Sequence, residues 1–416
     1  MKIIVNNTLR ISNPTKEVLD YCKKELEINN PQFIQNERLG FSTYRIPRKL
    51  CWYEKRGNDL ILPFGCLKKI YSLYPYAEDY KLLIPEAKKV KYKSNIKLYN
   101  YQEEAKNKAL KAKNGVIVMA AGSGKTQTAL QLIAELGVKT LWLTHTMDLL
   151  NQSYTRAKDN FENIKVSKIA NGKIDISEGI TFATVQTLCK ADLSQLKNEW
   201  SCIVVDEAHR LTGTPAQLGM FYKVINSLSA RYKFGLTATP TRAIKGTEKA
   251  LFSLIGDIIC EIPQEVIADR IIKAKVKPVM TSFDIPVSAL KYDGTISYSN
   301  LNTILCEDKE RNDIILDILR KHKNDYVLVL SDRLSQLEYL QAQLGYGVKI
   351  DGKMTSKTAK AQREKCIQDM RDGKEHLMLS SYLLAKERTR HTSIICFNTS
   401  KSAQRLCNYH TINSVE

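Results

Sequence analysis

The chain has 416 residues, enough for two or three domains with hydrophobic cores of ordinary size. Its hydrophobic content of 43% fits a globular protein, and no stretch approaches the roughly 20 apolar residues that a membrane span needs. The N-terminus, Met1-Lys2-Ile3-Ile4-Val5, lacks the apolar segment of a signal peptide. These features argue against a secreted or membrane-bound class, and we expect a cytoplasmic protein.

The chain is strongly basic, with 63 Lys and Arg residues against 44 acidic residues and a formal net charge of +19. This balance indicates a polyanionic partner, most simply nucleic acid, although a generic solubilising charge would give the same count. The ten cysteines are scattered, without a Cys-x-x-Cys pair or a Cys/His cluster. We therefore expect reduced thiols rather than a zinc site.

Residues 1–92 predict a small α+β domain that binds DNA. A helical pattern covers 15–26, and two apolar runs, 49–53 and 59–62, flank a Gly-Asn pair that is typical of a hairpin turn. Basic and aromatic side chains alternate in this region and form either a DNA-binding surface or, for the aromatic ones, part of the core. These residues are Arg45, Arg48, Lys49, Trp52, Tyr53 and Lys55.

Residues 93–261 alternate short apolar runs with helical patterns, which is typical of a parallel sheet covered by helices. The predicted strands are 116–119, 140–144, 165–169, 180–184, 202–205 and 234–237. Residues 262–416 predict a second, shorter unit of the same kind. Its strands are 326–330, 348–350 and 376–379, and its helices are 312–322, 335–344 and one that ends at Met370.

A phosphate-binding loop, Met119-Ala120-Ala121-Gly122-Ser123-Gly124-Lys125-Thr126, follows the first strand of the larger unit and opens into a helix over 126–136. Small residues let successive backbone N–H groups point at phosphate oxygens, and the helix N-terminus adds partial positive charge. Lys125 can reach the β- and γ-phosphates, and the Thr126 hydroxyl can hold Mg²⁺. The residues expected to bind nucleotide here are Ala121, Gly122, Ser123, Gly124, Lys125 and Thr126.

An acidic tetrad, Asp206-Glu207-Ala208-His209, ends a later buried strand. Asp206 is placed to hold Mg²⁺ from the other side, and Glu207 to orient the attacking water. Acidic residues often end strands, so the tetrad alone is weak evidence for a catalytic site. The loop and the tetrad in this order, however, predict a nucleoside triphosphatase with Lys125, Asp206, Glu207 and His209 as its catalytic residues.

The motifs resemble those of superfamily 2 helicases of the DEAH type, in the same order along residues 95–387. Leu98 to Ala105 resembles the adenine-reading segment, Gly235 to Pro240 the third motif, and Leu379 to Glu387 the start of the fifth. The resemblance implies two RecA-like lobes that close on ATP and Mg²⁺. It further implies adenine contacts from Tyr101 and Gln102, coupling through Thr237 and Thr239, and nucleic-acid contacts from Thr144, Thr184, Gln186, Thr187, Arg333 and Ser381.

Two N-terminal segments, 47–53 and 60–65, resemble the N-terminal module of phage branch-migration helicases. This second resemblance implies a motor that remodels forked or branched DNA, in a host-cell cytoplasm if a phage encodes it. The expected domains are 1–92, 93–261 and 262–416, the last an incomplete second lobe. A motor subunit of a restriction system is a further alternative, although no nuclease motif is visible.

The C-terminal end departs from the family pattern. After Glu387 the family continues Gly-Leu-Asp-Ile-Pro, whereas this chain has Arg388-Thr389-Arg390-His391-Thr392, and no Gln-x-x-Gly-Arg segment follows. One coding string for those five residues gives Gly-Leu-Asp-Ile-Pro when it is read one base later. We therefore hypothesise a frameshift at residue 388 that leaves 388–416 out of frame; the alternatives are a divergent C-terminus and, functionally, an ATP- and DNA-binding protein with a crippled motor.

Overall fold

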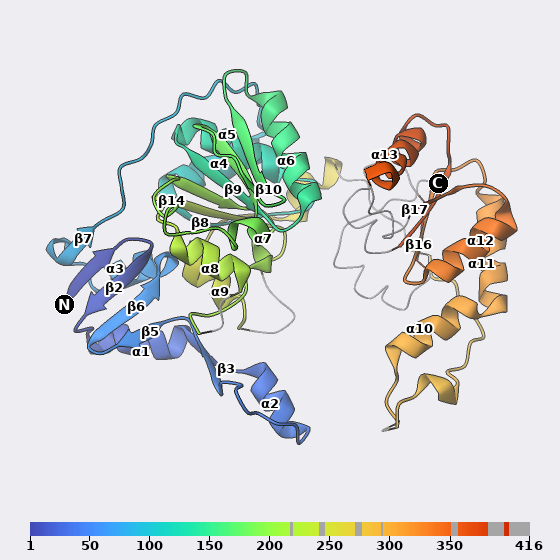
Figure 1. Cartoon of the computed structure of the whole chain (residues 1–416), viewed down its shortest axis with the longest axis horizontal. Helices are drawn as coiled ribbons and strands as arrows, with labels where there is room; N and C mark the ends of the chain where they lie inside the picture. Colours follow the sequence, from blue (N-terminus) through green and yellow to red (C-terminus); the bar gives the residue numbers. More distant parts are fainter. Residues whose placement is uncertain are drawn as a thin grey trace. The chain divides into compact units, whose positions relative to one another are not determined.

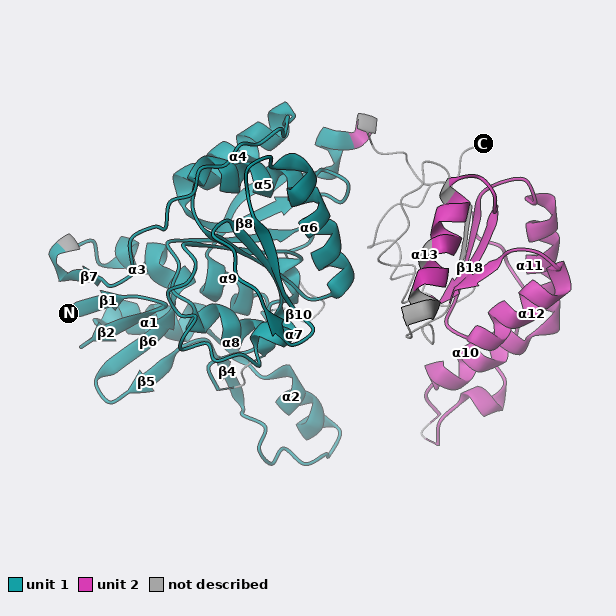
Figure 2. Ribbon diagram, turned by 45° about the horizontal axis from the view of Figure 1, so that its top comes forward, with its two compact units in different colours: residues 1–267 teal, residues 268–416 magenta. Residues whose placement is uncertain are grey.

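The computed structural model describes residues 1–216, 219–240, 246–270, 277–292, 294–350, 357–381 and 395–398. The chain divides into two compact units, unit 1 (Met1–Ile267) and unit 2 (Ala268–Glu416), shown in different colours in Figure 2. Each unit has its own sheet and its own core, so each is described by itself. Among the described helices, none is long and apolar enough to span a membrane.

The N-terminal part of unit 1 is a five-stranded sheet in the order β5-β6-β2-β1-β7, with helices beside it. In α1 the buried residues Val18 and Cys22 are one helical turn apart and face this sheet's core. The strands are β1 (Lys2–Val5), β2 (Thr8–Ser12), β5 (Glu54–Arg56), β6 (Asp59–Pro63) and β7 (Tyr80–Leu82). The helices and 3-10 turns are α1 (Lys16–Glu25), η1 (Phe64–Cys66), α3 (Leu67–Leu73) and η2 (Ala77–Asp79).

The predicted hairpin has a different first strand. Gly57 turns the chain as expected, but β6 pairs with β5 across that turn, and the segment at 49–51 pairs elsewhere. That segment is β4 (Lys49–Cys51), and it forms a separate two-stranded ribbon with β3 (Glu27–Asn29). A helix, α2 (Pro31–Arg38), lies beyond this ribbon, and Figures 1 and 2 both show it standing away from the rest of unit 1.

The remainder of unit 1 is built on an eight-stranded sheet in the order β11-β10-β12-β9-β13-β14-β8-β15, parallel except for β11. Its central strands are buried along their whole length, which explains why they are continuous apolar runs in the sequence. The strands are β8 (Asn114–Met119), β9 (Thr140–Thr144), β10 (Val166–Ala170), β11 (Lys173–Ile174), β12 (Ile180–Thr184), β13 (Cys202–Val205), β14 (Tyr232–Thr237) and β15 (Ile258–Ile262). The six predicted strands are present; β11 and β15 were not predicted.

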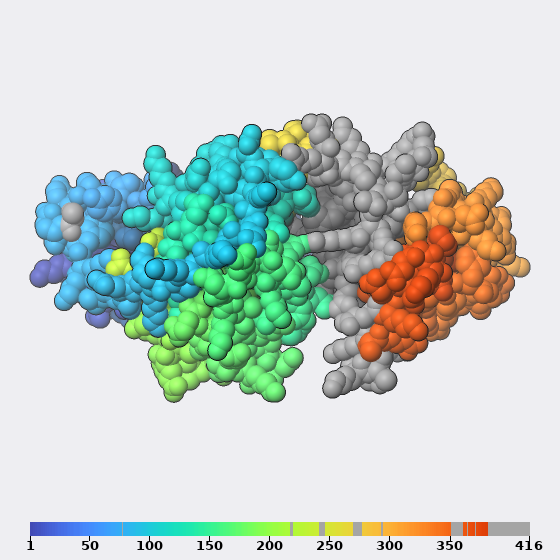
Figure 3. All heavy atoms as spheres, turned by 90° about the horizontal axis from the view of Figure 1, so that it is seen from above, coloured from blue at the N-terminus to red at the C-terminus, as the bar shows by residue number. Residues whose placement is uncertain are grey.

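Helices cover both faces of the eight-stranded sheet. One face packs against α4 (Asn100–Ala112), α5 (Lys125–Leu136) and α6 (Met147–Asn160) in a core of its own. The other face packs against α8 (Met220–Ser227) and α9 (Lys249–Ile255), and this core is continuous with that of the N-terminal sheet. Figure 3 shows the blue N-terminal residues adjoining the cyan and green ones without a break. Three short elements remain: α7 (Val185–Leu188), η3 (Ala208–Arg210) and η4 (Gln264–Arg270), the last of which crosses the boundary between the two units.

Unit 2 contains a parallel four-stranded sheet in the order β17-β18-β16-β19. One face packs against α11 and α12, and the other against α13. The strands are β16 (Val327–Ser331), β17 (Val348–Ile350), β18 (Leu377–Ser381) and β19 (Ile395–Asn398). The helices and turns are η5 (Val287–Ala289), α10 (Tyr298–Glu307), α11 (Lys309–Lys321), α12 (Leu334–Leu344) and α13 (Lys357–Arg371).

The edge of the unit 2 sheet next to β16 carries a strand. β19 pairs there in parallel, with Val327 opposite Ile395 and Leu330 opposite Asn398. The neighbouring residues 382–394 and 399–416 lie outside the described residues, as does most of the segment that resembles the fifth motif. The frameshift itself stays a hypothesis that resequencing of the gene would decide.

Candidate functional site

The phosphate-binding loop joins the end of β8 to the start of α5. Gly122 and Gly124 have φ angles of 78° and 81°, a left-handed conformation that favours glycine. Gly124 also lies close to Gln102, because a Cβ at this position would be 2.3 Å from the Gln102 amide nitrogen. The loop therefore needs glycine at position 124 for both its backbone conformation and its packing.

Lys125, the first residue of α5, lies at the centre of this loop. Its ammonium group donates to the backbone carbonyls of Met119 and Ala120 at 3.2 and 3.4 Å, and burial lowers its pKa. The buried Ser123 hydroxyl has no hydrogen-bond partner among the described residues. A buried cation and a buried unsatisfied hydroxyl beside a helix N-terminus fit the phosphates of a nucleotide.

The acidic tetrad begins directly after β13, two strands away from β8 in the sheet. Burial and the neighbouring Glu207 carboxylate raise the pKa of Asp206 to about 6, while Lys125 opposes that shift. The backbone N–H of Glu207 donates to the Asp206 carboxylate at 3.0 Å. Asp206 and Lys125 thus lie within electrostatic range, as a shared Mg²⁺–nucleotide site requires.

His209 joins the tetrad to the third motif. Its Nδ1 lies 3.2 Å from a carboxylate oxygen of Glu207 and 3.2 Å from the hydroxyl of Thr237 at the end of β14. The Thr237 hydroxyl in turn accepts from the backbone N–H of Thr239 at 3.1 Å. The structure therefore joins three of the expected catalytic residues to the two expected coupling residues through one chain of polar contacts, which does not include Lys125: Asp206, Glu207, His209, Thr237 and Thr239.

Tyr101 and Gln102 lie at the start of α4, and both side chains contact the phosphate-binding loop. The Tyr101 hydroxyl and the Gln102 amide donate to the Ser123 carbonyl at 3.1 and 2.8 Å. The other side of the Gln102 amide accepts from the backbone N–H of Tyr99 at 2.9 Å. In this structure Gln102 holds the loop in place, and its contact with adenine stays a prediction.

Three of the residues expected to bind nucleic acid line one open pocket of about 550 Å³ on unit 1. The Gln186 amide donates to the His145 carbonyl at 2.7 Å, and the hydroxyls of Thr184 and Thr187 lie 3.0 Å apart. The pocket is polar and basic in part, and it lies at the carboxyl ends of β9 and β12. Its lining residues are His145, Met147, Asn171, Gly172, Ile174, Thr184, Gln186, Thr187, Lys190 and Ala191.

The other expected contacts are placed differently. Thr144 is fully buried and its hydroxyl donates to the Thr146 carbonyl at 3.2 Å, so its contact with a nucleic-acid strand stays a prediction. Arg333 lies in unit 2, where its guanidinium donates to Ser299 and Thr303 of α10. Ser381 is the half-buried last residue of β18.

The turn that closes this pocket was not predicted from the sequence. Asn171 and Gly172 join β10 to β11 with φ angles of 53° and 77°, both left-handed. An Asn-Gly pair between apolar runs is a strong signal for a two-residue hairpin, so the turn was readable from the sequence. The exposed Ile174 and the nearby Lys190 complete the rim.

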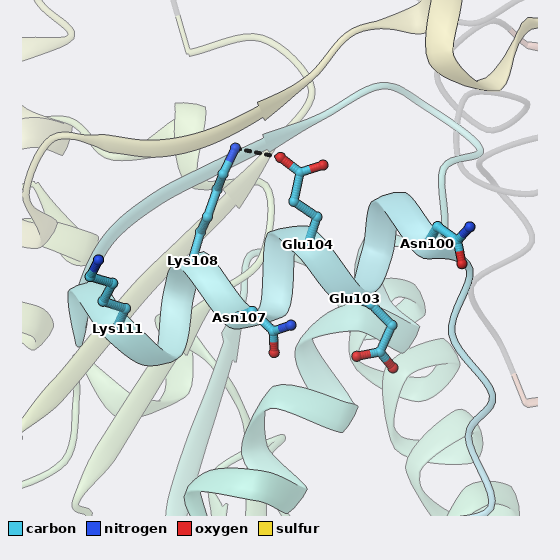
Figure 4. A pocket seen from close by; sticks show the side chains of 6 residues that line it. All are labelled: Asn100, Glu103, Glu104, Asn107, Lys108 and Lys111. Atoms are coloured by element: carbon cyan, nitrogen blue, oxygen red, sulfur yellow. Dashed lines mark ion pairs between the residues drawn. The ribbon is translucent and has the colours of Figure 1, made fainter.

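A second open pocket, of about 520 Å³, lies along the outer face of α4 (Figure 4). Glu104 and Lys108 form an ion pair within it at 2.6 Å. Its lining residues are Asn100, Glu103, Glu104, Asn107, Lys108 and Lys111, none of which the sequence analysis assigned to a site.

Comparison with known proteins agrees with this arrangement. Residues 95–242 match the family model described as "Type III restriction enzyme, res subunit". The chain is 27% identical to a DNA 3'-5' translocase, XPB2, of Sulfurisphaera tokodaii, over 70% of this chain and 71% of that protein. It is 25% identical to a putative ATP-dependent RNA helicase, L396, of Acanthamoeba polyphaga mimivirus, over 92% of this chain and 72% of that protein.

Among solved structures, the chain resembles the helicase domain of Pyrococcus furiosus Hef, with a TM-score of 0.50 and 16% identity over 76% of this chain and 94% of that one. This likeness concerns the fold, and it agrees with the predicted α/β class of parallel sheets covered by helices. The predicted resemblance is thus confirmed: by sequence the chain is similar to proteins named as a DNA translocase and a putative helicase, which agrees with the expectation of an ATP-hydrolysing enzyme.

Proposed function

We propose that the chain is an ATP-dependent motor that translocates on DNA and remodels forked or branched DNA during phage replication or recombination. The observation that carries this proposal is the hydrogen-bonded chain from Glu207 through His209 to Thr237. It joins the candidate hydrolytic residue to the motif that, in the resembling family, links nucleotide state to strand binding. A simple nucleotide-binding protein has no need for such a link.

Each residue of the nucleotide site would have a separate role. Lys125 would hold the β- and γ-phosphates, and Thr126 and Asp206 would hold Mg²⁺, which neutralises charge on the phosphates when it is bound. Glu207 would orient and deprotonate a water, a role supported by its carboxylate lying 3.2 Å from His209 Nδ1 next to the Mg²⁺-binding candidate Asp206. The raised pKa of Asp206 reflects a buried carboxylate whose natural counter-charge is a cation.

The pocket lined by Thr184, Gln186 and Thr187 supports contact with a nucleic-acid backbone. Hydroxyl and amide groups suit phosphate oxygens and carry no sequence preference by themselves. Of the two relatives above, one is named a DNA translocase and the other an RNA helicase. We favour DNA because the N-terminal segments resemble those of branch-migration helicases.

An ATPase assay tests the proposal, with the full chain and with Lys125→Ala as its matched control. ATP turnover should rise on addition of forked DNA, rise less with single-stranded RNA, and vanish in the Lys125→Ala variant. ATP turnover that does not change with any added nucleic acid, or that persists in Lys125→Ala, would contradict a DNA-driven motor centred on this loop.

A second function is favoured by one observation, the lack of a Gln-x-x-Gly-Arg segment anywhere in the chain. In the family, arginines of that segment reach the γ-phosphate, and losing such an arginine typically slows hydrolysis by roughly 10³–10⁵-fold. The chain would then bind ATP and DNA and scarcely turn over. A chain with the reading frame restored after Glu387 separates the two functions, because only a crippled motor gains unwinding on restoration.

A further inference from the structure

The ribbon β3–β4 carries an ordered arm, residues 30–48, whose two ends are held together by one side chain. Asn30 is only 3% exposed, and its amide donates to the Pro47 carbonyl at 2.8 Å. Its backbone N–H donates to the Arg48 carbonyl at 2.9 Å, and its side-chain oxygen accepts from Gln32 N–H at 3.0 Å. The chain therefore leaves and re-enters unit 1 at one clamped point.

Beyond this clamp the arm has defined structure but no core. The Phe41 N–H donates to the Asn36 carbonyl at 2.8 Å, and the Asn36 amide donates to the Ser42 carbonyl at 3.0 Å. Yet α2 buries none of its residues. Polar contacts hold the loop in shape, and although Phe33 and Ile46 are half-buried, other large apolar side chains of the arm are exposed.

Those apolar side chains form an exposed surface that we call the arm patch: Ile34, Leu39, Phe41 and Tyr44. Their exposed fractions are 47%, 55%, 64% and 78%. Single exposed apolar residues are common on protein surfaces, but here four large ones lie within eleven residues of an ordered arm. Such patches mark binding sites.

Three arginines lie in the same arm as the arm patch. Arg38, Arg45 and Arg48 are exposed, and within the described part of the chain none of them forms an ion pair. The guanidinium of Arg45 lies over the ring of Tyr44, 5.3 Å from its centroid. Lys49, by contrast, is committed to Glu27 at 2.9 Å, so it contributes less to a basic surface than the sequence indicated.

Uncommitted guanidinium groups next to exposed aromatic rings match a strand of nucleic acid with splayed bases. Arginine binds phosphate, and aromatic rings stack on any base that has left its helix. A protein partner of acidic and apolar surface is the competing occupant. The strongly basic chain and the phosphate-binding chemistry of the three arginines favour nucleic acid.

We propose that the arm recognises the branch point of forked DNA by stacking Phe41 and Tyr44 on unpaired bases while Arg38, Arg45 and Arg48 hold the flanking phosphates. This inference rests on the proposed function and goes further, because it assigns junction selectivity to a stacking element outside the eight-stranded sheet and its pocket. A fully paired duplex presents phosphates to the arm, but its bases have no ring face free for stacking.

The test compares the full chain with its Phe41→Ala/Tyr44→Ala variant on a fork that carries 2-aminopurine at the branch point, and on a blunt duplex. Fork affinity should fall by about ten-fold or more and duplex affinity by about two-fold at most, since stacking contributes only where bases are free. The wild-type chain should quench 2-aminopurine fluorescence, and the variant should not. Tyr292→Ala, at a fully exposed position in unit 2, is the matched control and should behave as wild type.

Several outcomes overturn the inference. The inference is wrong if the Phe41→Ala/Tyr44→Ala variant binds the fork with unchanged affinity. It is also wrong if the variant loses the same affinity for the fork and for the duplex. If the variant instead changes only the sedimentation of the protein alone, the arm patch is a protein-docking surface. Equal melting temperatures of variant and wild type confirm that folding is unaffected. Failure of the wild-type chain to bind any fork refutes the proposed function as well, whereas wild-type fork binding with an indifferent variant refutes the arm alone.

Discussion

Glu207 has a φ angle of 51°, a left-handed conformation that carries a cost for any residue with a Cβ. Residues held in this way are common at functional sites, where the surrounding structure compensates for the strain. Here the contacts with Asp206 and His209 hold the backbone and the carboxylate of Glu207 in place. This agrees with a role for its carboxylate that depends on exact placement rather than on charge alone.

Glu207→Gln should keep ATP binding and slow hydrolysis by at least about 100-fold, because a neutral amide cannot accept a proton from water. Nucleotide binding is measured with a fluorescent ATP analogue and turnover by phosphate release. Glu265→Gln, at an exposed position in η4, serves as the control. Normal hydrolysis by Glu207→Gln would show that another residue activates the water.

Lys233 is a buried lysine that the sequence did not indicate. It lies in β14, is 1% exposed, and donates to the Ile225 carbonyl at 3.2 Å. Burial lowers its pKa to about 7. Since the unfolded chain keeps an ordinary lysine pKa, it binds more protons than the folded chain between pH 7 and about 10.5, and the stability contributed by this group rises with pH across that window.

Lys233→Met should therefore remove part of the pH dependence of unfolding. Between pH 7 and 9 the wild type should gain up to about 2 kcal/mol relative to the variant. Urea unfolding followed by tryptophan fluorescence measures this in unit 1, because all three tryptophans lie there. The exposed Lys173→Met is the control; parallel pH profiles for wild type and Lys233→Met would refute the expectation.

The residues proposed for the nucleotide site were readable from the sequence because each of its motifs is a contiguous segment. Lys125, Asp206 and Glu207 each follow a buried strand, and parallel strands bring their carboxyl ends to one edge. The burial of Thr144 was not predictable, because its motif shows where the strand ends but not whether its hydroxyl faces solvent. The commitment of Gln102 to the loop depends on a distance between α4 and α5 that no local pattern encodes.

At the scale of elements, η1 and α9 approach each other unusually closely. A Cβ on Gly65 would lie 2.5 Å from the Phe252 carbonyl oxygen and 2.6 Å from the Gly256 nitrogen. Both are backbone atoms of the α9 region, which cannot yield as a flexible side chain can. This contact joins the N-terminal sheet to the helix that covers β14 and β8.

Gly65→Ala should destabilise unit 1 by about 3 kcal/mol, the usual range for overpacking a tight contact. The control is Gly57→Ala at a hairpin tip, where nothing lies within 4 Å and only the left-handed backbone costs about 1–2 kcal/mol. Chemical denaturation of both variants measures the difference. Equal losses in the free energy of unfolding for Gly65→Ala and Gly57→Ala would mean that η1 and α9 separate easily.

The alternation of strands and helices was predictable, since each buried parallel strand is an apolar run of its own. Strand pairing was not, because it depends on long-range contacts. Lys49–Cys51 has the composition of a hairpin strand, yet it pairs with residues 27–29 while the charged segment 54–56 pairs with β6. The edge strand β15 escaped detection because Glu261 interrupts its apolar pattern.

For the whole molecule, the charge of +19 predicts how DNA binding responds to salt. Affinity for DNA should fall linearly on a logarithmic scale as salt is raised, with a slope that grows with the number of phosphates contacted. Fluorescence anisotropy from about 50 to 200 mM salt measures this slope, and substituting Arg38, Arg45 and Arg48 by Gln should reduce it. An affinity that is flat over this range would count against phosphate-dominated contact.

The base of the arm is tied to α9 as well as to its own sheet. The Lys249 ammonium, at the start of α9, donates to the carbonyls of Lys24 and Glu27 at 3.4 Å, and Ile28 packs beside Gly246. In mechanical terms the arm is a lever fixed to the body that carries the phosphate-binding loop. A small rotation of that body is magnified at Phe41 and Tyr44, so a branch point held there would be displaced further than a strand held at the sheet.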